Sequence, residues 1–514
     1  MKRSISAILL VVIFAGCQQE AAVEEKTSVQ TYKMTTEIPI GILTPDKVET
    51  SIGTLEYFDG VPSKETSKNV YDYLDRMRGV DAFMKGIPGA SVRGLILGLE
   101  EVGVDDYNKV GITKTLLDSK SLLLTANTST IYVTPYINVG KSGPIVMETP
   151  PGMLGAFNDA WFRYIADIGP FGEDKGKGGN YLILPPGYEG EVPEGYFVIQ
   201  SPTNRVFVFT RTSIANGIEK AVKMIGENLK IYPLAEKDNA KKMELVDISG
   251  VDFNTVHTND FSFYEHLAEW INEEHVDMLD NQTKGLFASL GIEKGKPFAP
   301  DVRMKKILTE AVAIGNAAAR SITYYPRTDM NLEGVEIYPD SESSWIMAFA
   351  NKNVFFTTET GGYNTDALDM FHYNYTAVTP AMAVTMEGAG SDYAIAFLER
   401  DKNPFDGAKE YKLHIPANVP VNDFWAVTIY DTQTRSLLQT DQQFPTVGSL
   451  TEGFKQNEDG SFDVFFSPNP RPGQENNWLQ TIPGKSFIVI LRVYGPLKPW
   501  IEKTWRPGEV ELVK

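Results

Sequence analysis

Two strand-rich stretches on either side of a helical segment constrain the fold of this chain more than any other feature. Between about residues 120 and 212, short apolar runs such as "SLLLTAN", "TIYVTPYINV" and "RVFVFTRT" are separated by glycine and proline turns, and residues 410–496 have the same pattern. This pattern predicts β-structure in both stretches. Apolar residues at helical spacing predict helices within 62–86, 213–232 and 260–322, the first ending at Gly86 and Pro88. Mixed short strands are expected from 335 to 400.

Length, charge and cysteine content exclude several kinds of site and partner. The chain has 514 residues, enough for about two or three domains. Its formal net charge of −19 repels nucleic acid and anionic lipid headgroups, so neither is an expected partner. Cys17 is the only cysteine, which excludes a disulfide framework and a thiolate metal cluster within one chain.

The N-terminus has the layout of an export signal. Lys2 and Arg3 precede an apolar run over residues 8–14, which is too short to span a bilayer. "FAGC" resembles the bacterial lipoprotein signal, in which the cysteine becomes the lipidated first residue, although Phe14 stands where leucine is usual. We therefore expect membrane lipid to be attached through Cys17, with a plain cleaved secretion signal as the alternative. In lipoproteins of Gram-negative type, Gln18 after the cysteine favours the outer membrane of the cell envelope.

One short motif occurs in both strand-rich stretches. "NDAWFRYIAD" (158–167) and "NDFWAVTIYD" (422–431) share Asn-Asp-x-Trp followed after five residues by Asp, and each stretch later has a strand with an internal arginine. The order of these features suggests that one sandwich plan is used twice. In this plan Asp167 is paired with Arg211, and Asp431 is paired with Arg492.

These Asp and Arg residues allow two interpretations. A carboxylate and a guanidinium on adjacent strands can form a partly buried ion pair that fixes the strand register. Alternatively, the arginine binds an anionic or hydroxylated ligand at the mouth of a sandwich cavity, and the aspartate serves as acceptor or general base. Both interpretations remain open at the level of sequence.

The chain resembles two bacterial families of unknown function. "ANTSTIYVTPYINVGKSGPIVMETP" through "YFVIQSPTNRVFVFTRT" resembles domain of unknown function 1254, and "YKLHIPANVPVNDFWAVTIYDTQTRSLL" through "KTWRPG" resembles its companion, number 1214. The resemblance covers about residues 60–510 and implies two jelly-roll-like antiparallel β-sandwiches separated by a helical segment, in a multidomain α+β chain. It implies no established activity. Ser129 stands where the first family usually has an aspartate, so carboxylate chemistry is not carried over to that position.

From these features we divide the chain into five segments: a signal peptide (1–16), a lipidated N-terminus and flexible tether (17–58), N-terminal helices and β-sandwich (59–235), a helical middle segment (236–330) and a C-terminal β-sandwich (331–514). Metal-binding histidine pairs and nucleotide-binding loops are absent from the sequence, so no metal site and no cofactor are predicted.

Three functional hypotheses follow. An extracytoplasmic ligand-binding or assembly module, for a small molecule or saccharide, comes first because no catalytic constellation can be named. The alternatives are a hydrolase-like enzyme and a structural homo-oligomer formed through the helical middle. The candidate catalytic residues are Asp431, Arg492, Asp167 and Arg211, and the candidate ligand-binding residues are Tyr430, Arg435, Asn477, Trp478, Asn127 and Tyr132.

Overall fold

The computed structural model describes residues 32–214, 217–275, 277–330 and 332–513. The chain divides into two compact units, residues 1–77 and 78–514. The described part of the first unit contains an antiparallel sheet, the turn η1 and the beginning of helix α1 (Lys64–Glu101); the strands are β1 (Lys47–Thr50), β2 (Gly53–Phe58) and β3 (Val61–Pro62), and η1 is Ile40–Ile42. Cys17 and the predicted signal lie outside the described residues.

Helix α1 continues through the position where the sequence predicts its end. Pro88 removes one backbone donor, which costs about 3 kcal/mol in a helix interior. The indole N–H of Trp161 donates to the carbonyl of Lys85 at 3.2 Å, beside this interruption. Ile87 and Leu95 are buried further along the helix, each burial contributing about 1.5–3 kcal/mol. The predicted end at Gly86 and Pro88 is therefore wrong, because buried packing outweighs the local cost of proline.

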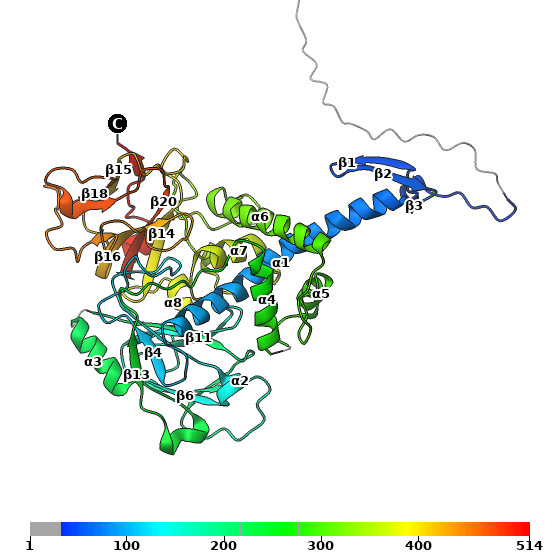
Figure 1. The fold of residues 1–514 in the computed structure, drawn as a ribbon. Helices are drawn as coiled ribbons and strands as arrows, with labels where there is room; N and C mark the ends of the chain where they lie inside the picture. The colour runs from blue at the N-terminus through cyan, green and yellow to red at the C-terminus, as the bar shows by residue number, and fades with distance from the viewer. Residues whose placement is uncertain (1–31, 215–216, 276, 331, 514) are drawn as a thin grey trace, which may run out of the picture. The chain divides into compact units, whose positions relative to one another are not determined.

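The second unit contains two β-sandwiches (Figure 1). In the N-terminal one, the sheet β10-β9-β6-β12 packs on the sheet β13-β4-β5-β11-β7-β8 over a shared apolar core. Its strands are β4 (Lys109–Ile112), β5 (Ile131–Pro135), β6 (Ile145–Thr149), β7 (Met153–Asp159), β8 (Tyr164–Ile168), β9 (Gly179–Leu184), β10 (Phe197–Gln200), β11 (Val206–Thr212), β12 (Lys230–Pro233) and β13 (Glu244–Asp247).

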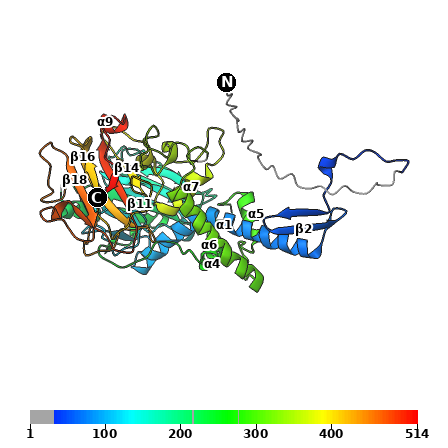
Figure 2. The same cartoon turned by 90° about the horizontal axis from the view of Figure 1, so that it is seen from above.

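The C-terminal sandwich has the sheets β14-β20-β16-β17 and β19-β18-β15-β21, with a second core between them. Figure 2 shows β14, β16 and β18 of this sandwich beside α9 (Lys498–Ile501). Its strands are β14 (Ser391–Ala396), β15 (Tyr411–Ile415), β16 (Val421–Asp431), β17 (Thr446–Gly448), β18 (Phe462–Ser467), β19 (Trp478–Gln480), β20 (Phe487–Pro496) and β21 (Val510–Leu512).

The two sandwiches have the same strand plan. Within the described residues, β5 to β12 correspond in chain order, sheet position and orientation to β14 to β21. The parallel pair β9–β10 even has its counterpart in β18–β19. The predicted class, a multidomain α+β chain with two jelly-roll-like sandwiches separated by a helical segment, is confirmed, and most strand pairs are antiparallel.

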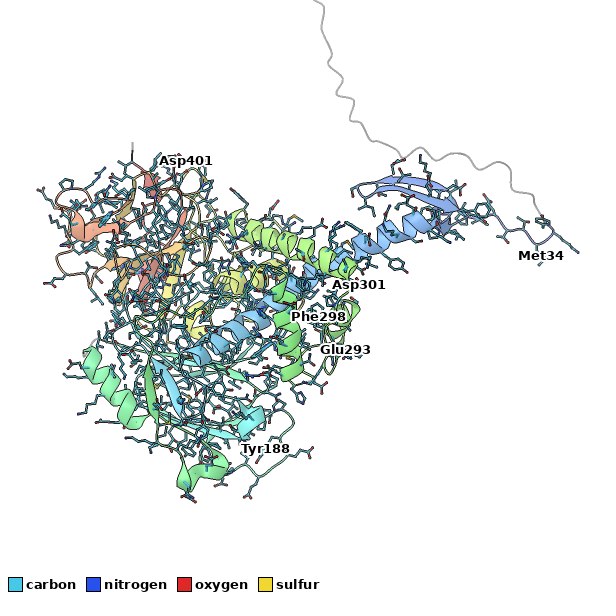
Figure 3. All side chains as sticks on the ribbon, viewed as in Figure 1. Met34, Tyr188, Glu293, Phe298, Asp301 and Asp401 are labelled. Carbon is cyan, nitrogen blue, oxygen red and sulfur yellow. The ribbon has the colours of Figure 1, made fainter. Side chains whose placement is uncertain are left out.

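The helices between the sandwiches contribute to a central apolar cluster together with α1. The turn between α5 and α6 carries Glu293, Phe298 and Asp301 (Figure 3), and the Asp301 side chain accepts from the Met304 amide to cap α6. The remaining helices and turns are α2 (Val139–Ser142), α3 (Ile218–Asn228), η2 (Leu234–Asn239), α4 (Ser262–Glu273), α5 (Asn281–Ser289), α6 (Val302–Tyr324), η3 (Ala350–Lys352), α7 (Thr365–Asn374), α8 (Pro380–Ala383) and η4 (Glu475–Asn477).

Three further local predictions are wrong. The predicted helix 213–232 stops early, because residues 230–233 form β12 against β6. Helix α7, capped by the side chain of Asn364, occupies part of the region expected to hold only short strands. Residues 121–127 form irregular chain instead of a strand, because the backbone of Thr125 is hydrogen-bonded to Arg435 and Arg492 of the other sandwich. The boundaries of the five proposed segments stay predictions. Every described helix is too short or too polar to cross a bilayer.

Gly98 of α1 provides a test of this close packing. A methyl group at Gly98 would overlap the backbone carbonyl oxygen of Asn254. We expect Gly98→Ala to lower the free energy of unfolding by about 1–3 kcal/mol, measured by denaturant unfolding. Gly285→Ala in α5 is the matched control, because a methyl group there meets open space and should stabilise the helix by about 0.5–1 kcal/mol. Equal effects of the two substitutions would contradict this account of the packing.

Candidate functional site

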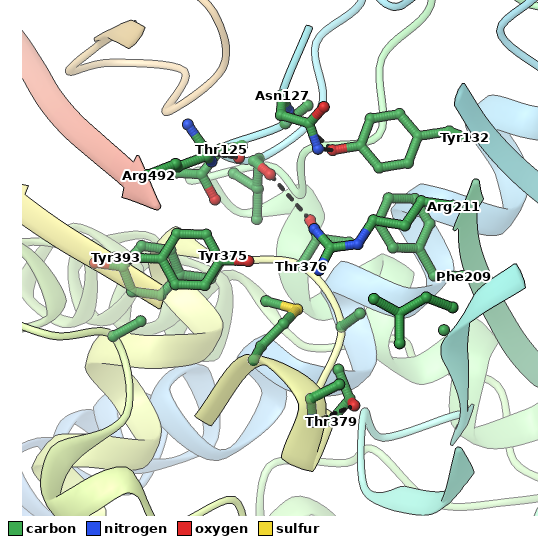
Figure 4. A pocket seen from close by; sticks show the side chains of 18 of the residues that line it. Thr125, Asn127, Tyr132, Phe209, Arg211, Tyr375, Thr376, Thr379, Tyr393 and Arg492 are labelled. Carbon is green, nitrogen blue, oxygen red and sulfur yellow. Dashed lines mark hydrogen bonds between the residues drawn. The ribbon is translucent and has the colours of Figure 1, made fainter. Parts of the chain in front are cut away.

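A cavity lies between the two sandwiches. Each sandwich has one sheet face that points away from its own core, and these two faces meet at the cavity. Along β11 and β20, alternate residues point to opposite faces. Val208 and Leu491 therefore enter the two cores, while Arg211 and Arg492 line the cavity. The cavity measures about 70 Å³. Figure 4 shows Arg211 and Arg492 with the aromatic side chains of Tyr132, Phe209, Tyr375 and Tyr393 around it.

Each sandwich supplies a matching tyrosine–arginine pair. Tyr132 on β5 lies directly opposite Arg211, and Tyr393 on β14 lies directly opposite Arg492. Because β5 and β11 correspond to β14 and β20 in the shared plan, the two pairs occupy equivalent positions. The cavity thus receives the same two residue types from each half of the structure.

Two segments outside the strands complete the wall, and we name them strap A (residues 124–127) and strap B (residues 375–382, which ends within α8). The Thr376 hydroxyl of strap B donates to the Leu124 carbonyl of strap A at 3.3 Å. The side chain of Asn158 makes two hydrogen bonds to the Val378 backbone and so fixes strap B to the N-terminal sandwich. The Tyr430 hydroxyl donates to the Ala126 carbonyl at 2.6 Å and fixes strap A to the C-terminal sandwich.

Each arginine reaches across to the opposite sandwich. Arg211 Nη2 donates to Ser391 Oγ at 2.9 Å, and Arg492 Nη2 donates to the Thr125 carbonyl at 2.6 Å. Arg492 also lies over the rings of Tyr393 and Tyr430, at 5.7 and 5.4 Å from the ring centroids. Among the described residues that line the cavity there is no aspartate or glutamate, so it contains two cations without a carboxylate counterion.

Burial sets the protonation of the lining residues. It acts to lower the pKa of Arg492, but the neighbouring tyrosines outweigh it and raise that pKa, so the guanidinium stays charged. Burial also raises the pKa of Tyr132 to about 12, and it raises the pKa of Tyr375. Both phenols are therefore neutral near pH 7 and can donate a hydrogen bond.

Two buried donors in this wall have no hydrogen-bond partner. Arg492 Nη1 and the hydroxyl of Tyr375 belong to side chains that are 3% and 4% exposed. In Figure 4 the hydroxyl of Tyr375 and the guanidinium of Arg211 point toward one another from opposite sides of the cavity. Leaving such a group unpaired costs about 1–3 kcal/mol, so the wall is suited to a ligand that presents acceptors.

Four of the candidate residues are brought together: Arg211, Arg492, Asn127 and Tyr132 all line the cavity. The Asn127 side chain donates to the Tyr132 hydroxyl at 2.7 Å, and its oxygen accepts from the Ser129 and Thr130 amides. Asn127 therefore shapes the end of strap A and orients Tyr132.

Asp431 and Arg492 are on adjacent strands but are not paired. Arg492 lies opposite Ala426, five positions before Asp431. Asp431 instead forms an ion pair with Lys485, and its side chain accepts from the Gln433 amide at 2.6 Å. Asp431 therefore stabilises the turn that follows β16.

The other four proposed ligand contacts lie outside the cavity lining. Three of them have hydrogen-bond partners of ordinary length, whereas Arg435 donates only from Nη1 to the Gln433 carbonyl at 3.4 Å, and its Nε and Nη2 have no partner. Tyr430 supports strap A, as described above, and Arg435 is buried with its guanidinium 4.0 Å from the Tyr373 ring centroid. Asn477 accepts from the Lys455 amide at 2.8 Å, and the Trp478 indole donates to the Ser467 carbonyl at 2.8 Å. Their assignment as ligand contacts stays a prediction.

Asp167 lies beneath the wall. It is on β8, separated from β11 by β7, so it is not on the strand next to Arg211. Its Oδ1 accepts from the Thr379 hydroxyl of strap B at 2.7 Å, while Oδ2 is buried without a partner. Burial raises the pKa of Asp167 to about 6, and the hydrogen bond from Thr379 only partly opposes that shift.

The repeated Asn-Asp-x-Trp motif does not mark equivalent positions. Residues 158–167 span the end of β7, a turn and β8, whereas residues 422–431 lie within the single strand β16. Sequence reasoning did not name Tyr375 or Tyr393, which lie in the region expected to hold mixed short strands. The signals that pointed to the cavity were an arginine within an otherwise apolar strand and the segment with Asn127 and Tyr132.

The described residues contain no cluster of histidine, cysteine and carboxylate side chains suited to a metal ion. Burial lowers the pKa of His257 to about 3 and that of His372 to about 4, so both are neutral near pH 7. Glu269 of α4 forms an ion pair with Arg93.

Comparison with known families agrees with this two-part architecture. Residues 107–233 match the family described as protein of unknown function DUF1254, and residues 390–498 match protein of unknown function DUF1214. The expected pair is present. The DUF1254 match contains Arg211 and the DUF1214 match contains Arg492, so each family contributes one arginine to the cavity.

Solved structures with similarity to the chain include two bacterial proteins. The VPA0106 protein from Vibrio parahaemolyticus is 17% identical with a TM-score of 0.49, over 86% of this chain and 100% of the other. A putative uncharacterized protein from Burkholderia cenocepacia is 11% identical with a TM-score of 0.37, over 87% of this chain and 96% of the other. A search of curated proteins found no match.

The raised pKa of Asp167 gives a pH-dependent prediction. A carboxyl whose pKa is near 6 when folded and near 4 when unfolded destabilises the folded state as pH rises from 4 to 6. Asp167→Asn removes this effect. The free energy of unfolding of the variant minus that of the native chain should therefore be about 1–3 kcal/mol larger at pH 8 than at pH 4. Denaturant unfolding at both pH values measures the difference, with the exposed Asp401→Asn as control (Figure 3). A difference that does not change with pH would contradict the assignment.

Proposed function

We propose that this protein is an envelope-anchored lipoprotein that binds a small oxyanion in the cavity between its two sandwiches. One observation carries the proposal: Arg211 and Arg492 line a cavity to which no described aspartate or glutamate contributes. Burying a charge without a counterion is strongly unfavourable, and a bound anion would supply the missing charge.

The chemistry of the arginines favours an oxyanion in particular. A guanidinium presents several donors in a plane that fits carboxylate, sulfate or phosphate oxygens. Arg492 uses Nη2 for strap A and leaves Nη1 free for a ligand. The formal net charge of −19 repels anions at long range, so binding would depend on these short, desolvated contacts.

The two other functional hypotheses have less support. A hydrolase using Asp431 with Arg492 requires the two side chains to meet, but Asp431 closes a turn and pairs with Lys485. Asp167 is separated from the cavity by Thr379, since the threonine lines the wall and the aspartate lies behind it. No observation on the helical middle favours a structural oligomer.

The first test measures anion binding directly. We expect formate, acetate, sulfate or phosphate to raise the thermal unfolding temperature of the full chain in mild detergent, because a ligand that binds only the folded state stabilises it. Arg492→Gln should abolish this shift, since it removes one of the two cations. The exposed pair Arg400–Glu511 offers a matched control, and Arg400→Gln should leave the shift unchanged. A chain that none of the four anions stabilises would contradict the proposal.

The second test concerns the anchor. In a Gram-negative expression host the native chain should sediment with the outer membrane, since each buried CH₂ of an acyl chain contributes about 0.8 kcal/mol of membrane affinity. Cys17→Ser should move the protein to the soluble periplasmic fraction, as measured by fractionation and immunoblotting. Retention of Cys17→Ser in the membrane would show that attachment does not depend on the thiol.

A further inference from the structure

We infer that the ligand of this cavity is a short carboxylate of about two to four carbons with an oxygen on the neighbouring carbon, that is, a small 2-hydroxy or 2-oxo acid, and that Tyr375 recognises this second oxygen. The inference rests on the proposed anion binding and deepens it. It names the class of ligand and the residue that selects it.

Size is the first constraint. The cavity measures about 70 Å³, whereas an engineered cavity that holds benzene measures about 150 Å³. A benzene ring or a long acyl chain therefore exceeds the available space. A few non-hydrogen atoms fit, which is the size of an inorganic oxyanion or a short organic acid.

The distribution of polar atoms separates these two possibilities. Arg211 and Arg492 supply charge for one anionic group, and the unpartnered hydroxyl of Tyr375 lies on a different segment, strap B. Tyr375 is 4% exposed, so its hydroxyl has little access to solvent water as an alternative partner. Because burial raises its pKa, the phenol stays protonated and donates to a neutral or anionic oxygen. A ligand with a carboxylate and a second oxygen satisfies both sets of donors.

Much of the remaining wall is apolar, and threonines in it donate their hydroxyls to protein groups: Thr210 to the Val133 carbonyl, Thr376 to the Leu124 carbonyl and Thr379 to Asp167. The side chains of Leu124, Leu154, Met382, Ile395 and Ile490 line the cavity together with alanines of strap B. A tetrahedral phosphate or sulfate would place oxygens against these side chains without partners, which is unfavourable. The carbon skeleton of a short acid can contact the same surface without that cost.

Isothermal titration of the full chain in mild detergent with lactate, pyruvate and propionate tests this inference. The three acids are similar in size, but propionate lacks the second oxygen. We expect the native chain to bind lactate or pyruvate about 3–10-fold more tightly than propionate, the value of one net hydrogen bond. Tyr375→Phe should bring the affinity for lactate and pyruvate down to that for propionate, and it should not reduce stability because it removes a hydroxyl that has no partner.

Tyr494→Phe is the matched control. Tyr494 is also buried with an unpartnered hydroxyl, but it does not line the cavity, so its substitution should leave the preference unchanged. Equal binding of all three acids by the native chain, or an equal loss in both tyrosine variants, would overturn the role of Tyr375 while leaving anion binding intact. Benzoate bound more tightly than lactate would overturn the size argument. Failure of every acid to bind would instead contradict the proposed function itself.

Discussion

The reciprocal crossing of two arginines, Arg492 buried and Arg211 half-buried, is the interaction on which the arrangement of the sandwiches depends. Arg211 leaves the N-terminal sandwich to reach Ser391, and Arg492 leaves the C-terminal sandwich to reach strap A. Both guanidiniums enter the same enclosed space, where each would repel the other more strongly than in water. Hydrogen bonds to neutral oxygens hold both guanidiniums in place of carboxylates, and Arg492 also contacts two tyrosine rings.

The shared strand plan explains how this arrangement arises. Each sandwich has one sheet whose outer face carries a tyrosine opposite an arginine, and the two faces meet. Polar and charged residues on such a face need partners from the opposing sandwich, because the face is not exposed to water. Strap A supplies such a partner to Arg492, and Ser391 of β14 supplies one to Arg211, so the straps belong to the site together with the strands. Asn158 and Tyr430, one from each sandwich, then hold the straps in position.

Periodicity predicted most of the regular parts of this structure, although not α7 or β12, and it missed the irregular ones. In both sandwiches, apolar runs that form the strands are separated by turn residues. Arg211 and Arg492 each interrupt such an apolar run, so sequence reasoning named both arginines. Residues 121–127 ("SLLLTAN") begin with the apolar run of a strand, but the partners of the Thr125 backbone are Arg435 and Arg492, the second 367 residues away. No local pattern encodes such partners. The same limit explains why Tyr375 and Tyr393 were missed, and why Asp431 was placed beside Arg492 although the strand register separates them.

The position of the cavity also links ligand binding to the contact between the sandwiches. Arg492 contributes Nη2 to that contact and has Nη1 left over, so a ligand can be added without breaking the hydrogen bond to Thr125. Any molecule that neutralises the two arginines then removes the main repulsion between the opposing sheet faces. Because such a ligand contacts both sandwiches and both straps, its binding free energy adds to the stability of the whole second unit rather than of one domain. A site of this kind joins recognition to domain association through the same two side chains, which is a physical reason for the two domains to occur in one chain.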